Sequence, residues 1–118
     1  MKKLWSIFTD DMETCIMTHL SGYGVERHHV FEGLQGHKAK SEKYGFIVPL
    51  YKTVHVNGSS CRYPNWNDLD HWLKRMCQEY YIEHYGSRED WYKEFGKFYD
   101  DRENERIWLN GAFEWREK

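Results

Sequence analysis

Three histidines occur at positions in the sequence where a reactive site can form. His28 and His29 lie in a β-type run, residues 25–31, and His55 follows the next such run, residues 44–51. A neutral imidazole can take a proton from an attacking water, and imidazoles also bind divalent metals. The same pair also fits a purely structural interpretation. In that case His28 and His29 alternate between the two faces of a strand, one in the core and the other at the surface.

The cysteines argue against a disulfide-stabilised protein. Cys15, Cys61 and Cys77 are odd in number and show no CxxC spacing, so we expect a reducing compartment, the cytoplasm. No apolar run approaches the ~20 residues that cross a bilayer, and the first ten residues lack the apolar stretch of a secretory signal. We therefore expect a cytoplasmic protein without a membrane partner.

Length and composition predict one globular domain over residues 1–118. The mass is 14.5 kDa, and aromatic residues make up 18% of the chain, so large rings must build much of the core. The net charge of −2 excludes a strongly basic DNA-coating protein. Residues 27–55 nevertheless carry five Lys or Arg side chains against two Glu, together with four histidines.

The clearest predicted element is a helix over about residues 66–85. Asn65 can cap its start, and Gly86 can supply the left-handed residue that ends it. Its apolar face recurs at helical spacing: Leu69, Trp72, Leu73, Met76, Tyr80 and Tyr81. The pattern from Ser87 to Asp90 is that of a capping box, which predicts a second helix with Trp91, Phe95 and Phe98 as its apolar stripe.

The first half of the chain reads as a small β element. Residues 15–32 predict a hairpin, residues 33–43 a polar loop, and residues 44–51 a further strand that Pro49 places at an edge or near its end. Residues 107–115 predict a third short helix or a hairpin. The expected fold class is α+β, with a small β-hairpin followed by two or three C-terminal helices.

The order of several short motifs resembles a known family. The segments RHHVFEG (27–33) and SEKYGFIVPL (41–50) precede His55, and the segments LDHWLKRMCQ (69–78), YGSRE and FGK follow. This order is similar to that of the small HNH-like (His-Me finger) endonucleases of bacteriophages and prophages. The resemblance covers about residues 13–99 and leaves residues 100–118 as an aromatic, acidic extension.

The resemblance implies a ββα-metal element and a metal-dependent phosphodiester hydrolase acting on nucleic acid, DNA rather than RNA. Transferred position by position, it makes His29 the general base and His28 and His55 metal ligands, with Mg²⁺ or a similar divalent ion as cofactor. It also implies a phage or prophage gene whose product acts in the cytoplasm of a bacterial host.

The sequence departs from the family pattern at its metal-binding positions. Family members with a structural zinc use two CxxC pairs, whereas this chain retains Cys15 and has Thr18, Tyr51 and Val54 at the other three places. We therefore expect no structural zinc. The family's later histidine falls near residues 61–63, where this chain has none, so one position that holds the catalytic metal is lost.

These losses leave a second interpretation open, a catalytically silent HNH-derived binding protein. Such a protein would inhibit a host defence nuclease, of the anti-CRISPR or anti-restriction type, by protein–protein contact. Acidic residues with exposed rings suit docking on a basic, nucleic-acid-binding partner. The expected contact residues lie in the extension: Glu103, Glu105, Trp108, Glu114 and Trp115.

Overall fold

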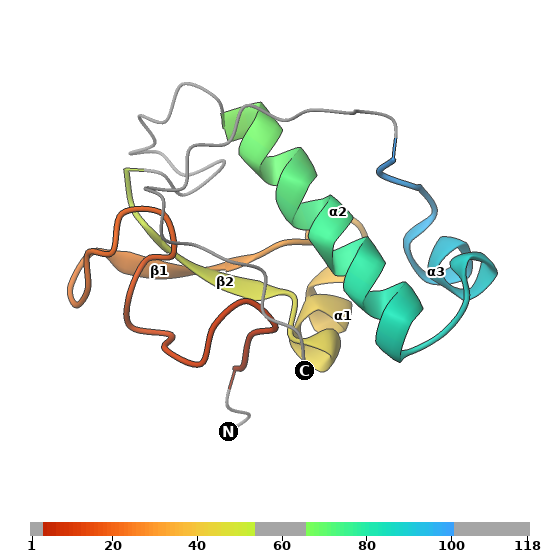
Figure 1. Cartoon of the computed structure of the whole chain (residues 1–118), viewed down its shortest axis with the longest axis horizontal. Helices are drawn as coiled ribbons and strands as arrows, with labels where there is room; N and C mark the ends of the chain where they lie inside the picture. Colours follow the sequence, from red (N-terminus) through yellow and green to blue (C-terminus); the bar gives the residue numbers. More distant parts are fainter. Residues whose placement is uncertain (1–3, 54–65, 101–118) are drawn as a thin grey trace.

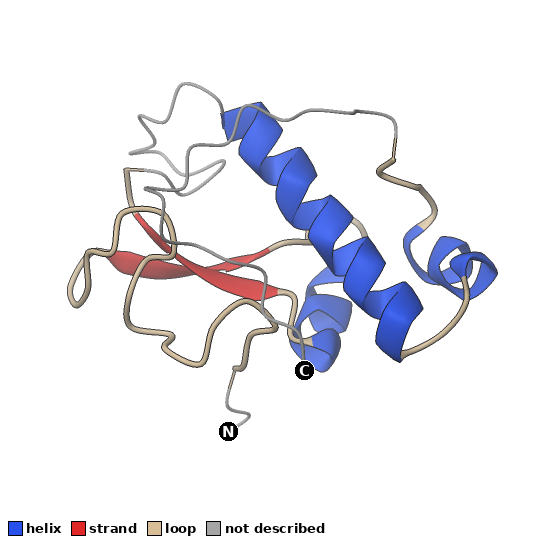
Figure 2. Cartoon of the chain, in the orientation of Figure 1, coloured by secondary structure: helices blue, strands red, loops and turns tan. Residues whose placement is uncertain are grey.

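The computed structural model describes residues 4–53 and 66–100. The elements follow one another as β1 (Val25–His29), α1 (His37–Tyr44), β2 (Ile47–Tyr51), α2 (Trp66–His84) and α3 (Arg88–Phe95) (Figure 1). Figure 2 shows α2 running past the two strands, with α1 and α3 on either side of its C-terminal half. The α+β class is confirmed, while the element expected at residues 107–115 lies outside the described residues.

The two strands pair with each other in an antiparallel ladder. Val25 is opposite Tyr51, and His29 is opposite Ile47. Because the described sheet has two strands, each of them is an edge strand, as Pro49 predicts.

The hairpin expected within residues 15–32 is wrong, because β1 takes its partner from later in the chain. Thr14 and Ser21 form only an isolated bridge. Between them the chain turns tightly, with the His19 amide donating to the Cys15 carbonyl and His19 in the left-handed region at φ 64°. A turn this short leaves no extended segment to pair with β1.

Helix α1 is a second correction, since residues 33–43 were expected to be a loop. Most of its residues, with Ala39, three lysines and Glu42, favour helix, but they form no apolar stripe that would reveal it. The helix is bounded by Gly36 and Gly45, both in the left-handed region that favours glycine. Ser41 and Tyr44 are its buried residues.

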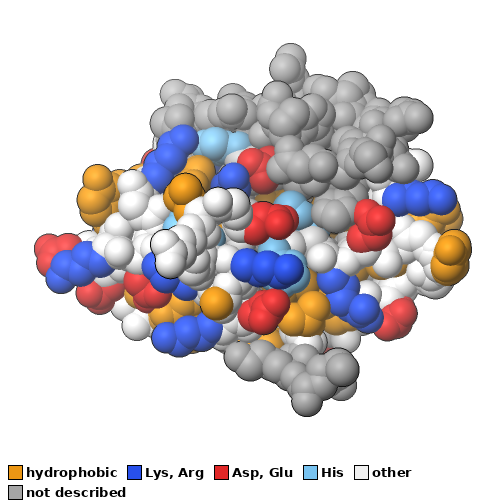
Figure 3. All heavy atoms as spheres, turned by 180° about the vertical axis from the view of Figure 1, so that it is seen from behind, with side chains coloured by type: hydrophobic (Ala, Val, Ile, Leu, Met, Phe, Trp, Pro, Cys, Tyr) orange, Lys and Arg blue, Asp and Glu red, His pale blue; other side chains and the backbone are white. Residues whose placement is uncertain are grey.

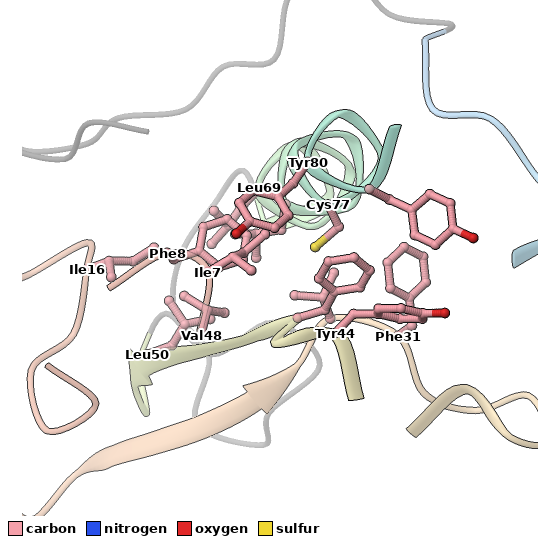
Figure 4. Close-up of a cluster of buried hydrophobic side chains, with 14 of the residues drawn as sticks. Ile7, Phe8, Ile16, Phe31, Tyr44, Val48, Leu50, Leu69, Cys77 and Tyr80 are labelled. Atoms are coloured by element: carbon pink, nitrogen blue, oxygen red, sulfur yellow. The ribbon is translucent and has the colours of Figure 1, made fainter. Parts of the chain in front are cut away.

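Helix α2 has the predicted extent and covers the strands with its apolar face (Figure 4). Leu69, Leu73 and Tyr80 are buried as expected, and Trp72 and Met76 pack against the same cluster while partly exposed. From the other side the strands contribute Val48 and Leu50, and the N-terminal segment contributes Ile7 and Phe8.

Helix α3 begins with the predicted capping box. The Ser87 hydroxyl accepts from the Asp90 amide, and the Asp90 carboxylate accepts from the Ser87 amide. Gly86, however, does not adopt the left-handed conformation expected of it. A Cβ at Gly86 would come within 2.8 Å of Asp90 Oδ2, so close approach to the capping side chain explains this glycine.

Candidate functional site

The adjacent histidines at the end of β1 belong to opposite faces of the strand pair. His28 is opposite Val48, His29 is opposite Ile47, and consecutive strand residues alternate between faces. Val48 points into the core beneath α2 (Figure 4), so His28 faces the core, where only 2% of it is exposed. His29 is only partly buried and lies on the opposite face.

On that face, His29 pairs with Glu42 of α1. The His29 Nε2 atom lies 2.9 Å from Glu42 Oε2, and the two side chains are 13% and 29% exposed. An ionised carboxylate only accepts hydrogen bonds, so Nε2 carries the hydrogen and Nδ1 of the neutral ring can accept a proton. A carboxylate in this position orients the ring and stabilises the imidazolium that forms when the proton arrives.

Buried Ser41 fixes α1 against the end of β1 and thereby places Glu42. The Ser41 hydroxyl donates to the Phe31 carbonyl at 2.8 Å and accepts from the Phe31 amide at 3.0 Å. Sequence reasoning missed Glu42 as a site residue, because it is 13 residues from His29 and was assigned to a loop. The one available signal was its place in the SEKYG segment.

The expected metal ligands do not form a centre within residues 4–53 and 66–100. His28 lies in the core, and His55 lies outside the described residues. Among the described residues, no three His, Cys, Asp or Glu side chains come close enough together to bind a metal ion. Another buried histidine, His71 of α2, stands edge-on to the Tyr99 ring, with the two ring centroids 5.6 Å apart. The described residues thus form an acid–base pair and do not by themselves fit a divalent metal.

Cys15 lies in a turn whose amide groups point towards its sulfur. The amides of Met17 and Thr18 each donate to Cys15 Sγ at 3.3 Å. The resemblance places Thr18 at the position of the family's second thiolate. Tyr51, which the resemblance places at the third position, packs against the hydrophobic cluster, whereas Val54 lies outside the described residues.

The contact residues of the binding alternative also lie outside the described residues, in the segment 101–118. In the described part of the chain, no helix combines the length and the apolar content required to cross a membrane.

No family model, curated protein or solved structure matches this chain.

Proposed function

We propose that this chain is an HNH-like phosphodiester hydrolase acting on nucleic acid, with His29 as the general base. The observation that carries the proposal is the contact between His29 Nε2 and Glu42 Oε2 at 2.9 Å. With Nε2 held by the carboxylate, Nδ1 takes the proton of a water molecule that attacks the phosphorus atom. Glu42 acts through His29, as a positioning residue.

The proposal also includes a divalent metal ion, although the described residues do not form a site for it. A divalent ion such as Mg²⁺ would stabilise the charge on the phosphate and on the leaving oxygen. The family resemblance assigns His28 and His55 to it, although His28 faces the core, on the opposite side of the strand pair from His29. We place the reaction in the cytoplasm of a bacterial host, with DNA as the substrate and a phage or prophage gene as the source.

A plasmid-nicking assay with Mg²⁺, Mn²⁺ and Ni²⁺ tests this function. Replacing a general base costs about 10²–10⁴-fold in rate, so His29→Ala should lower nicking by at least about a hundredfold. DNA affinity and thermal stability should stay near the wild-type values, because the base contributes little to ground-state binding. Glu42→Gln should lower the rate less, since the base itself is retained.

Two matched variants serve as controls. His19→Asn changes an exposed histidine whose left-handed backbone suits asparagine, and Glu32→Gln changes an exposed loop carboxylate. Both should nick DNA at the wild-type rate. Wild-type protein that fails to cut single- and double-stranded DNA and RNA with each metal would contradict the proposal.

The second candidate, a silent inhibitor of a host defence nuclease, has one observation in its favour. Tyr85 and Tyr92 are 45% and 54% exposed at the end of α2 and in α3, beside the acidic residues Glu89 and Asp90. Exposed tyrosines next to carboxylates suit a basic protein surface. If this function holds, Tyr92→Ala should weaken inhibition of the target nuclease, whereas His29→Ala should leave inhibition unchanged.

A further inference from the structure

Three lysines from three separate parts of the chain converge on one group of aromatic rings. Lys40 comes from α1, Lys74 from α2, and Lys97 from the segment after α3. The Lys40 ammonium lies 5.5 Å from the Phe95 ring centroid, and that of Lys74 lies 5.9 Å from the Phe31 centroid. The Lys97 ammonium lies 5.3 Å from the Tyr99 centroid.

The rings themselves are in contact, so the three lysines lie around one connected group of rings. The Phe31 centroid is 4.6 Å from that of Phe95 and 6.0 Å from that of Tyr99. The His37 ring stands edge-on to the same group, 5.6 Å from Phe95. We call this set the basic–aromatic cluster, and its members are Phe31, His37, Lys40, Lys74, Phe95, Lys97 and Tyr99.

Acidic side chains compensate only part of this charge. Lys74 pairs with Asp70 at 2.9 Å, whereas Lys40 donates to the backbone carbonyl of Glu94. Within the described part of the chain, neither Lys40 nor Lys97 has an ion-pair partner. The back of the molecule, seen in Figure 3, shows Lys and Arg side chains beside histidine side chains, with Asp and Glu side chains interspersed among them.

The titration of His37 agrees with this arrangement. Burial lowers the pKa of the His37 ring, and the nearby charges of Lys40 and Lys74 lower it further. An additional positive charge is therefore unfavourable among these groups, whereas an anion is attracted to them.

We propose that the basic–aromatic cluster binds the phosphate backbone of the nucleic-acid strand on which His29 acts. This inference rests on the proposed function, because it supplies the substrate surface of the same site. Helix α1 connects the two places. It carries Lys40 in the cluster and Glu42 beside His29. Lys40 and Glu42 are two positions apart, about 200° around the helix axis, so they project from different sides of α1. A helix with its side chains is about 10–12 Å across, so the strand has to pass around α1 to contact both.

The combination of lysine ammonium groups and aromatic rings in the cluster suits a phosphate backbone. Lysine ammonium groups neutralise phosphates as point charges without reading the base sequence. Each of the three ammonium groups lies over an aromatic ring, and the Phe31 and Phe95 rings are buried, so the ammonium groups are left to make the contacts. The cluster is thus expected to give affinity without sequence preference.

Binding of a DNA duplex to the full chain, measured by fluorescence anisotropy at several salt concentrations, tests the inference. Each lost phosphate contact lowers the salt slope of log K by about 0.9, so the triple variant Lys40→Gln/Lys74→Gln/Lys97→Gln should lower it by about 2–3. Lys97→Gln alone should lower it by about 1. This single variant keeps the test valid if the triple variant folds poorly, since Lys97 is exposed.

Lys93→Gln is the matched control, because Lys93 is an exposed α3 lysine that pairs with Glu89 outside the cluster. It should bind DNA like the wild type. An unchanged slope in both cluster variants, an equal loss in the control, or no DNA binding by the wild type would overturn the inference. Failure of this inference can be distinguished from failure of the proposed hydrolase function. DNA bound through these lysines but never cut contradicts the hydrolase alone, while cutting that depends on His29 but not on the lysines contradicts the inference alone.

Discussion

Tyr44 of α1 and Tyr81 of α2 donate their phenolic hydrogens to the same oxygen of Glu94 in α3. The two O···O distances to Glu94 Oε2 are 2.5 Å and 2.8 Å. The Tyr44 and Tyr81 ring centroids are 5.4 Å apart and edge-on. Lys40 also donates to the Glu94 carbonyl. One residue of α3 therefore joins all three helices, and it does so beside the basic–aromatic cluster.

Glu94→Gln should destabilise the protein and shift a tyrosine titration. Hydrogen bonds to a charged group contribute about 1.5–3 kcal/mol, so we expect a loss of about 1–3 kcal/mol in urea unfolding. Burial, followed by the Glu94 carboxylate, raises the pKa of Tyr81 to about 12. Absorbance titration of the variant should show a lower pKa for Tyr81, still above the ordinary value because burial remains.

Glu89→Gln is the control for this change. Glu89 is on the same helix, 80% exposed, and pairs only with Lys93 at 3.5 Å among the described residues. Its replacement should change the free energy of unfolding by less than about 0.5 kcal/mol. Equal stabilities of the two variants would show that the carboxylate does not link the helices.

The contacts that act within a few residues of sequence were the ones that could be predicted. Ser87 and Asp90 are three positions apart, and the capping box they form was read directly from their types. Leu69 and Leu73 recur one turn apart, so the buried face of α2 followed from periodicity.

The contacts that define the candidate site span larger separations and left no such pattern. Glu42 is 13 residues from His29, and Glu94 is 50 residues from Tyr44. Ser41, which anchors α1, reads as an ordinary polar residue until its hydroxyl meets the backbone of Phe31. Tertiary pairing of polar groups depends on the fold itself, so local rules could not give it.

Leu73→Ala tests the assignment of the buried face of α2. Leu73 is fully buried between α2 and the strands, and removing three carbons there should cost about 2–5 kcal/mol in chemical denaturation. Leu34→Ala is the matched control, because Leu34 is 67% exposed, and its cost should stay within about 0.5 kcal/mol. If Leu73→Ala and Leu34→Ala cost a similar amount of stability, the assignment of Leu73 to the buried face of α2 is wrong.

Stability should fall as the pH is lowered through the titration of His37. The pKa of the His37 ring is lowered from 6.5, first by burial and then by Lys40 and Lys74. The unfolded chain therefore binds a proton at a higher pH than the folded chain does. The free energy of unfolding should decrease as the pH falls below 6.5, until the folded ring also becomes protonated. Above that window His37 adds no pH dependence.

Urea unfolding measured across this pH range gives the readout. His37→Asn cannot titrate, so its stability should fall less than that of the wild type. Lys40→Gln removes one neighbouring charge and should therefore reduce the difference between the His37 pKa values of the folded and unfolded chains. The difference should not disappear, because burial is the larger cause of the lowered pKa. If the free energy of unfolding of His37→Asn falls with pH as steeply as that of the wild type, other groups cause the acid sensitivity.

Removal of metal with EDTA should leave the fold intact. The family resemblance places Thr18 and Tyr51 at two of the positions where a structural zinc would need thiolates, and Tyr51 packs with the hydrophobic cluster. The sulfur of Cys15 accepts two amide hydrogen bonds from its own turn, and these bonds help to hold the turn. Thermal unfolding should therefore give the same midpoint with and without the chelator, and elemental analysis should find no stoichiometric zinc.

The expectation fails if zinc co-purifies at one ion per chain and EDTA lowers the midpoint, because metal binding would then contribute to folding. A chelator that stops DNA nicking while the midpoint stays constant would instead assign the metal to the reaction, and a divalent ion added back should restore the rate.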